Sequence, residues 1–540
     1  MRKKYTPVAF ENLFIGMTDK GPENDEKGPA VRKLINFDVD GNTAYPRGGV
    51  KELMDVGKEI IEVYALKTPT SIKVHAFTVD ELFVAEFANG AMGPVVSYGN
   101  YDTTNFIDVV PYLRETTVLN SGSITASYEQ YIEPAGNITK EAYTGKILRL
   151  VNGNKTEDIS VSFNTDKEIE VDGYIENDYA GGTYQIYDTE KTLLFTANGK
   201  VYRIEGTSVV NMPEHNYDFL GVHAGKLFAS RADDAKVVFT NTQTMYFPRQ
   251  QETMFDPGDG KFLGFENYFN GLVILMERGI YTISGQLPEE MIPEKRQTSD
   301  ISVVSRHSFK TKGGVMYMVT DNGFQSFNRL ESQASPEART ISPMLNDSRF
   351  KSENLGTHVP MVTYGNKVLT QMNDHILVYD AEMSIMQQRH WFGEYKGFTF
   401  RAGMEADKTL FLAIGNTICT LEKNKHTDDN TGNPIVSTVE GNHLEYGQRD
   451  IQKRFRDVIT YQTWNGTHRV IRVTTGGRKI DNYTEERSSV NGDVLDDEES
   501  FDCRMVSPYL YWKIEMEGDF TLEDIIFWLK PQSLYAKSHE

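Results

Sequence analysis

The chain has 540 residues, with 56 Lys and Arg against 77 Asp and Glu, which gives a formal net charge of -21. This balance argues against a general nucleic-acid clamp, which carries a basic surface. An acidic wall would still let nucleic acid pass without gripping it, and net negative charge also keeps a large protein soluble. Two cysteines, Cys419 and Cys503, exclude a disulfide scaffold.

The N-terminal stretch MRKKYTPVAFENLF has basic residues but no apolar core of a secretory signal. The chain also has no run of 18 or more apolar residues, the length that a membrane-spanning helix requires. We therefore expect a soluble protein, without membrane insertion, that is made in a reducing cytoplasm.

Residues 1 to about 50 have the composition of an N-terminal arm. Asp19–Lys27 is charged and rich in turn formers, so we expect a loop there. A strand is predicted at Leu34–Val39 and a returning strand at Thr43–Tyr45, with Pro46–Gly49 ending the pair. We expect this arm to pack with the C-terminal part of the chain.

A repeated β-hairpin unit organises residues 51–430, and its clearest copy is Phe262–Gly285, FLGFENYFNGLVILMERGIYTISG. Asn-Gly and X-Gly pairs between short apolar runs are typical of antiparallel hairpins, because these residues accept positive φ. Related units end in turns near Asn198, Asp234, Arg278, Asn322, Asp374 and Asn416. A spacing of roughly 35 to 50 residues is close to that of four-stranded propeller blades. We predict a β-propeller of about six to seven blades; a β-sandwich with ordinary hairpins is the alternative.

The repeat is lost at about 124–182, although this stretch still consists of β-hairpin sequence. An inserted small β-domain and strongly diverged blades explain it equally well. Helical periodicity is weak throughout, with one short helix expected at Ser342–Phe350. The chain is therefore predicted to be all-β.

The polar segment Lys423–Pro434 reads as a linker and as the best domain boundary. Longer alternating strands follow it; Leu510, Trp512, Ile514 and Met516, for example, share one face. We predict a C-terminal β-sandwich platform at 431–540. The acidic run Asp493–Asp502 is expected to be a solvated loop.

Motifs of catalysis and of metal or cofactor binding are absent from the sequence. His390-Trp391-Phe392 is more simply explained by packing than by catalysis. Asp256–Gly260 crowds two carboxylates but lacks the other ligands of a calcium loop, so a plain turn is expected. Adjacent acidic pairs such as Glu289-Glu290 point to opposite faces of an extended chain. We therefore expect no enzyme, no cofactor and no metal.

Basic and aromatic residues gather early in the C-terminal part of the chain. Arginine and aromatic side chains together are typical of protein interfaces, while a charged sheet face exposed to water is the alternative. We predict an interface that contains Arg449, Lys453, Arg454, Phe455, Arg456 and Trp464. Further basic residues follow at Arg469, Arg472, Arg478 and Lys479.

Three phrases of the sequence resemble phage tail and head-to-tail connector propellers. They are LINFDVDGNTAYPRGG, GLVILMERGIYTISG and GNHLEYGQRDIQKRFRDVITYQTWNGTHRVIRV, in that order along the chain. The order arm, propeller, β-platform is similar to that of tail nozzles (tubular protein B) and packaged-DNA stabilisation proteins of short-tailed phages. The likeness covers most of the chain outside about 124–182.

The resemblance implies a structural virion protein of the tail, assembled in the host cytoplasm. Such proteins form a ring, usually of six copies, below the portal and adaptor, and seat tail fibres or a needle. They surround the DNA channel, retain the packaged genome and pass it at ejection, without recognising DNA sequence. Arg449–Arg456 would then contact a neighbouring copy or the adaptor.

A second hypothesis is a β-propeller glycan hydrolase or glycan-binding protein. Its aromatic candidates are Trp391 and Trp512, and its carboxylates would come from different blades. An unrelated propeller scaffold is the third possibility.

Overall fold

The computed structural model of the protein describes two compact units, Lys58–Arg339 (the five-blade unit) and Met1–Gly57 together with Thr340–Glu540 (the platform unit). Its described residues are 6–9, 17, 31–40, 43–249, 251–268, 271–285, 290–298, 303–328, 337–343, 345, 347–350, 355, 358–386, 390–441, 452–477, 480–489, 492–493 and 495–531.

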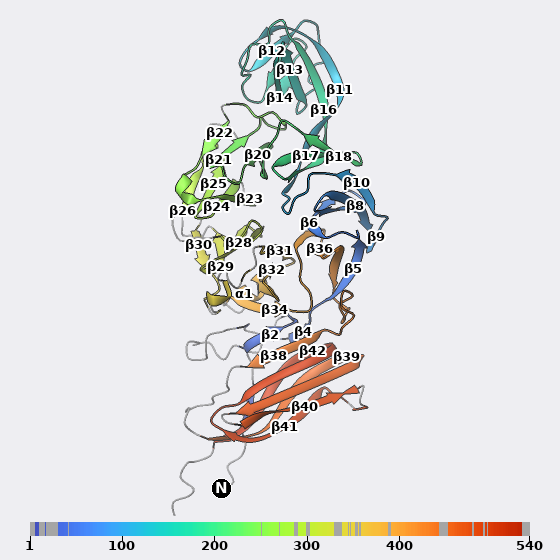
Figure 1. Cartoon of the computed structure of the whole chain (residues 1–540), viewed down its shortest axis with the longest axis vertical. Coiled ribbons are helices and arrows are strands. Elements are labelled where there is room, and N and C mark those ends of the chain that lie inside the picture. Colours follow the sequence, from blue (N-terminus) through green and yellow to red (C-terminus); the bar gives the residue numbers. More distant parts are fainter. Residues whose placement is uncertain are drawn as a thin grey trace, which may run out of the picture. The chain divides into compact units, whose positions relative to one another are not determined.

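The five-blade unit consists of consecutive antiparallel blade sheets (Figure 1). The first strands of consecutive sheets lie against one another, as β11 does on β19 and β23 on β27. Blade strands are β6 (Ile60–Lys67), β7 (Ile72–Thr78), β8 (Glu81–Ala88), β9 (Ala91–Met92), β10 (Val96–Asn100), β11 (Val109–Ser127), β16 (Thr183–Ala197), β17 (Lys200–Glu205), β18 (Ser208–Met212), β19 (Phe219–His223), β20 (Lys226–Ser230), β21 (Lys236–Phe239), β22 (Glu252–Met254), β23 (Phe262–Tyr268), β24 (Gly271–Met276), β25 (Gly279–Ser284), β26 (Glu294–Thr298), β27 (Phe309–Lys312), β28 (Val315–Thr320), β29 (Gly323–Asn328) and β30 (Glu337–Thr340). The predicted all-β propeller is confirmed.

The repeat at Phe262–Gly285 forms β23, β24 and β25 in the predicted register, with Ile274 opposite Tyr281. A fourth strand, β26, completes the sheet. Gly279 is required by a close approach, because a Cβ there would lie 2.7 Å from Asp259 Oδ2. Of the predicted Asn270-Gly271 turn, Asn270 lies outside the described residues.

Residues between two blade strands form a separate barrel-like insertion. β11 has 19 residues and β16 has 15, longer than one blade sheet accommodates. Register shifts between Glu115 and Asn120 mark where the pair leaves the blade. Beyond them β11, β12 (Tyr131–Pro134), β15 (Ile169–Val171), β14 (Lys155–Asn164), β13 (Ile147–Asn152) and β16 pair in a closed circuit around their own apolar core. The stretch without the repeat is thus an inserted domain.

The platform unit contains two further four-stranded meanders. One is formed by β31 (Met361–Tyr364), β32 (Lys367–Gln371), β33 (Ile376–Asp380) and β34 (Trp391–Tyr395). The other is formed by β35 (Ala402–Ala406), β36 (Thr409–Ile414), β37 (Thr417–Glu422) and, from the N-terminal segment, β5 (Gly49–Asp55). The expected helix at Ser342–Phe350 is a short 3-10 turn, Asp347–Phe350, and an unpredicted helix α1 spans Ala381–Met386.

The C-terminal region of the platform unit is the predicted β-sandwich. Its strands are β38 (Val436–Gly441), β39 (Lys453–Gly477), β40 (Ile480–Ser488), β41 (Glu498–Ser507) and β42 (Tyr511–Pro531). The rings of Trp512 and Phe527 pack with centroids 5.3 Å apart, although a straight strand would separate them by roughly 50 Å. β42 therefore turns back on itself, and Gly518, with φ 115°, lies between the two halves.

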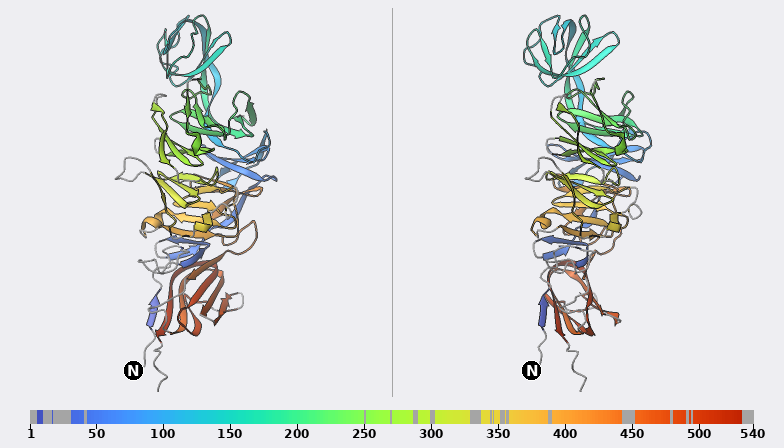
Figure 2. Two further views of the ribbon diagram at one scale, coloured as in Figure 1. Left: turned by 60° about the vertical axis from the view of Figure 1, so that its left-hand side comes forward. Right: turned by 90° about the vertical axis from the view of Figure 1, so that its left-hand side faces the viewer.

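Arm strands pair with the sandwich (Figure 2). β1 (Thr6–Ala9) pairs with the end of β42, and β2 (Val31–Ile35) lies between β38 and β34. The hairpin of β3 (Phe37–Asp40) and β4 (Thr43–Pro46) reaches β42 through Ala44 and Leu522. Each of these pairings joins residues from the two ends of the chain.

Two polar segments each contain a buried carboxylate, and for Asp493–Asp502 the expected solvated loop is wrong over its second half. Asp428, in the expected linker Lys423–Pro434, is buried and hydrogen bonded to Arg47 and Val50. Half of the acidic run belongs to strand β41, where Glu499 is buried and paired with Arg487. An arginine compensates each of these carboxylates: buried Arg47 pairs with Asp428, and partly exposed Arg487 pairs with Glu499.

Candidate functional site

The sequence-predicted interface lies on β39, which pairs with β41 on one side and β42 on the other, and the strand divides it between two faces. Lys453 and Phe455 are buried, whereas Arg454 and Arg456, which alternate with them along the strand, are exposed. This follows from the two-residue period of a strand. Arg449 lies outside the described residues.

The buried members of this set have structural roles. Lys453 is 1% exposed and its Nζ donates to the Pro508 carbonyl at 2.8 Å. Trp464 packs edge-on against Phe520, with centroids 5.7 Å apart. Among the predicted interface residues that the structure describes, only Arg454 and Arg456 therefore present charge to solvent.

The later arginines that the structure describes have hydrogen-bond partners within the chain. Arg472 donates to Glu486 Oε2 at 2.5 Å and to Glu517 Oε1 at 2.6 Å. Arg469 donates to the backbone carbonyls of Gly466 and Leu495. Arg478 and Lys479 fall outside the described residues.

A second candidate site lies where the first strands of the five-blade unit converge. The Arg306 guanidinium lies 4.5 Å from the ring centroid of Phe106 and 4.8 Å from that of Phe219. The His307 ring packs at a tilt of 52° against Phe106, with centroids 5.2 Å apart, and His307 Nδ1 lies 3.7 Å from Glu62 Oε2. Cation–π contact with two rings holds this arginine at the centre of the unit.

Two carboxylates near this cluster connect neighbouring blades. Asp108 accepts a hydrogen bond from the Leu220 backbone N–H at 2.9 Å, and Glu266 accepts one from Thr311 N–H at 2.9 Å. Burial raises the pKa of Asp108 to about 6, while the bond from Leu220 opposes that rise. Each carboxylate thus links one blade to the next through a hydrogen bond from a backbone N–H group.

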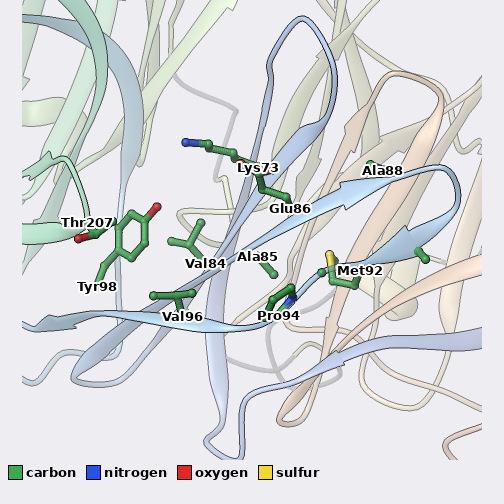
Figure 3. Close-up of a pocket in the computed structure, with 12 residues that line it drawn as sticks. Lys73, Val84, Ala85, Glu86, Ala88, Met92, Pro94, Val96, Tyr98 and Thr207 are labelled. Carbon is green, nitrogen blue, oxygen red and sulfur yellow. The ribbon is translucent and has the colours of Figure 1, made fainter.

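A cleft of about 580 Å³ lies on the outer part of the first blade sheet (Figure 3). Its lining is mainly apolar, with Val84, Met92, Val96 and Tyr98 around it. The volume falls in the range of small-ligand pockets. Convergent polar groups that would select a ligand or carry chemistry are few in this lining.

The turn Asp256–Gly260 has its carboxylates engaged. Asp259 accepts from the Tyr281 hydroxyl and from Lys295 Nζ, the latter at 2.7 Å to Oδ1. Asp256 accepts from Gly258 N–H at 2.9 Å. Across the described ranges, no group of three His, Cys, Asp or Glu side chains could hold a metal ion.

Two further observations concern the part of the chain that the structure describes. Cys419 and Cys503 are free and buried, and burial raises their thiol pKa values to about 12 and about 11. None of the described helices has the length and apolar character needed to span a membrane.

The acidic residues that share a face with the basic cluster were missed by the sequence reasoning. Glu498 and Asp524 lie on the same outward face of the sandwich as Arg454, on either side of Tyr461. The strict alternation of buried and exposed residues along Glu498–Ser507 could have placed Glu498 there. Asp524 could be placed on this face only from the pairing of β39 with β42.

The comparisons with known proteins found similarity to solved structures alone. No family model matches the chain, and no curated protein matches it. Similar solved structures include the β-propeller domain of Cps50 (Swd1) from Myceliophteria thermophila, at 7% identity and a TM-score of 0.38, covering 69% of this chain and 98% of that one. The Pan2 WD40 domain of Neurospora crassa is similar at 6% identity and a TM-score of 0.35, covering 71% and 97%. An extracellular domain of a hybrid two component system from B. thetaiotaomicron follows at 8% and 0.32, covering 89% and 77%.

Proposed function

We propose that the protein is a structural component of a phage tail, a nozzle or hub below the portal and adaptor. In this proposal copies of the chain form a ring around the DNA channel, retain the packaged genome and pass it at ejection. Portal, adaptor and fibre or needle proteins are its partners, and the protein is not an enzyme.

The observation that carries the proposal is the order arm, propeller, platform together with the pairing that ties its ends. The phrase LINFDVDGNTAYPRGG forms β2, β3, β4 and the start of β5. β2 pairs with β38 of the sandwich, and β5 completes the meander of β35–β37. Pairing of arm strands with later strands of the chain suits a structural protein under mechanical load, because separating the arm would break backbone hydrogen bonds.

In this proposal the DNA channel forms between copies of the chain rather than through one chain. Arg306, held between Phe106 and Phe219, occupies the convergence of the inner strands. A duplex that passes the protein would run along an outer surface of each copy. With a net charge of -21, that surface would release few counterions on contact and let DNA slide.

Electron microscopy and mass photometry of the purified chain, with and without a portal–adaptor complex, test this proposal. A closed ring, of about six copies, on the adaptor is expected. A chain that remains outside purified virions and forms no ring with the adaptor would overturn it. Immunogold localisation on virions supplies the independent readout.

A second function, glycan hydrolysis or binding, has one observation in its favour. Asp108, with its raised pKa, and Glu266 come from different blades of one unit, as catalytic carboxylates of a propeller would. Both carboxylates already accept backbone hydrogen bonds, however, and Trp391 and Trp512, the expected sugar-stacking residues, are 1% and 0% exposed. A glycan array with wild type and Asp108→Asn tests this alternative: turnover that Asp108→Asn abolishes would favour it.

A further inference from the structure

The outward face of one half of the sandwich separates its charges by sign. This face, here called the dipolar face, is formed by β41, the first part of β39 and the last part of β42, which pair side by side. Their core-facing neighbours, such as Phe455, Phe501 and Phe527, are 0 to 1% exposed. The outward residues between them are exposed or partly exposed.

One end of the dipolar face is basic. Arg454 lies directly opposite Lys530 on β42 and Val506 on β41. Arg456 and Arg504 follow one row further along, each contacting an aspartate of the next row. Arg454 is exposed, and Lys530 is partly exposed.

The other end is acidic. Tyr461 lies opposite Glu498 on β41 and Asp524 on β42, so two carboxylates flank its ring. Seven residues of strand separate Arg454 from Tyr461, which corresponds to roughly 20 Å. Because the Debye length is about 8 Å at physiological salt, the two ends do not neutralise each other.

Apolar side chains lie between the charged ends. Ile459 is paired with Ile526, and Trp528 occupies the neighbouring row; all three are partly exposed. A central aromatic and aliphatic patch with charges at its edges is the composition of an interface core and rim. The pattern thus offers both apolar area to bury and charges to orient a partner.

The other half of the same sandwich shows the opposite arrangement. There Arg472 is bound between Glu486 and Glu517, and Arg487 pairs with Glu485 and Glu499. Charges of opposite sign are thus interspersed on that half. Segregation on the dipolar face is therefore a local property and does not follow from the composition of the domain.

We infer that the dipolar face binds the same face of a second copy of this chain. A two-fold axis through its centre would place the basic end of each copy on the acidic end of the other and stack the apolar rows. The fit is self-complementary because the two ends have opposite signs and similar charge. This inference does not depend on the proposed tail function, since it concerns the free chain.

A two-fold contact is closed and cannot by itself build a ring, which needs a heterologous interface. Paired chains would therefore form ring contacts through other surfaces, or separate first. Pairing in solution and ring formation on an adaptor are distinguishable by particle mass.

Analytical ultracentrifugation of charge-exchanged variants tests the inference. Wild type is expected to form particles of twice the chain mass of 61.3 kDa, more readily at low than at high salt. The double variants Arg454→Glu/Lys530→Glu and Glu498→Lys/Asp524→Lys should each weaken pairing by at least about tenfold, because like charges then meet. An equimolar mixture of the two variants should restore pairing, since opposite charges again face each other.

Lys155→Glu/Lys167→Glu is the matched control, because it makes the same change of net charge at exposed positions of the barrel-like insertion. It should pair as wild type does. Tryptophan fluorescence during urea unfolding verifies folding of the two double variants of the dipolar face, since Trp391, Trp464, Trp512 and Trp528 all lie in the platform unit, and far-UV circular dichroism verifies folding of the control.

Three results would overturn the inference. They are a wild-type chain that stays monomeric at low salt and about 50 µM, pairing unaffected by both double variants, and a mixture of folded variants that fails to pair. A ring on the adaptor that survives both exchanges would uphold the tail function while rejecting this contact. Restored pairing of the mixed variants, without any ring on the adaptor, would uphold this contact while rejecting the tail function.

Discussion

Arg47 and Asp428 form a buried, two-pronged ion pair that joins the arm to the segment before the sandwich. Arg47 NH2 lies 2.6 Å from Asp428 Oδ2, and NH1 lies 2.9 Å from Oδ1, with side chains 1% and 5% exposed. Asn36 accepts from Arg47 Nε at 3.0 Å, and the Phe398 ring lies 4.8 Å from the guanidinium. Every polar atom of this pair thus has a partner, which is the condition for stable burial of charge.

Asp428→Asn should destabilise the platform unit by about 3 to 5 kcal/mol, because it leaves the buried Arg47 charge uncompensated. Tryptophan fluorescence during urea unfolding reports on this unit alone. As the control, Glu422→Gln breaks the exposed pair with Lys51, whose side chains are 46% and 37% exposed. It should cost less than about 1 kcal/mol. Equal effects of the two changes would refute a special role for the buried pair.

Asp108→Asn should change the pH dependence of the five-blade unit. Because burial raises the folded pKa to about 6 from 3.8, the folded chain binds this proton more tightly than the unfolded chain. The stabilisation from this proton is present at low pH and is lost as the pH rises through about 6.

Relative to wild type, Asp108→Asn should therefore gain up to about 3 kcal/mol of stability between pH 4 and pH 7.5. Far-UV circular dichroism during urea unfolding measures this gain, with the tryptophan transition of the platform unit as the internal reference. Asp166→Asn, at an exposed position, is the matched control. A stability difference between wild type and Asp108→Asn that does not change with pH would contradict the raised pKa of Asp108.

Gly518→Ala should prevent the bend of β42. A Cβ at this position would lie 2.0 Å from the His468 carbonyl oxygen, and φ is 115°. Gly415→Ala is the matched control, because its φ is 62° but nothing lies within 4 Å of the added carbon. We expect about 1 kcal/mol for the control and a loss of folded platform, seen by tryptophan fluorescence, for Gly518→Ala. Similar unfolding curves for both variants would show that the backbone moves enough to remove the close contact between the added Cβ and the His468 carbonyl oxygen.

Both thiols should be inert in the folded chain. Burial raises the pKa values of Cys419 and Cys503 to about 12 and about 11, so little thiolate exists at pH 8. Ellman's reagent should detect close to no thiol in the native protein and two per chain in guanidinium chloride. Rapid reaction of one thiol without denaturant would locate an opening of the surrounding strands.

The hairpins of this protein are visible in its sequence because they are local. Gly279 closes a turn in which a Cβ would crowd Asp259, and the short apolar runs Leu272–Met276 and Ile280–Ser284 on either side of it predict two paired strands. The change to longer alternating strands after Pro434 likewise predicts the sandwich. Repeat, strand type and domain order thus follow from short-range patterns.

The same patterns do not say which face of a strand is buried or what it meets. Arg454, Phe455 and Arg456 were grouped by composition, yet β41 and β42 place Phe455 in the core and the two arginines outside. Lys453 can be buried because its Nζ donates a hydrogen bond to the backbone carbonyl of Pro508, which lies 55 residues away in the sequence. The predicted interface therefore contained both core and surface residues.

The sequence by itself determined the all-β class, the repeated hairpins and the order arm, propeller, platform, because turn residues and a two-residue period act over a few positions. Only the tertiary structure decided the Arg47–Asp428 pair, the closed insertion between β11 and β16, and the sign-separated face of Arg454 and Glu498. These features join residues from distant parts of the chain. Their formation depends on which sheets dock, and docking is a property of whole surfaces that local sequence does not encode.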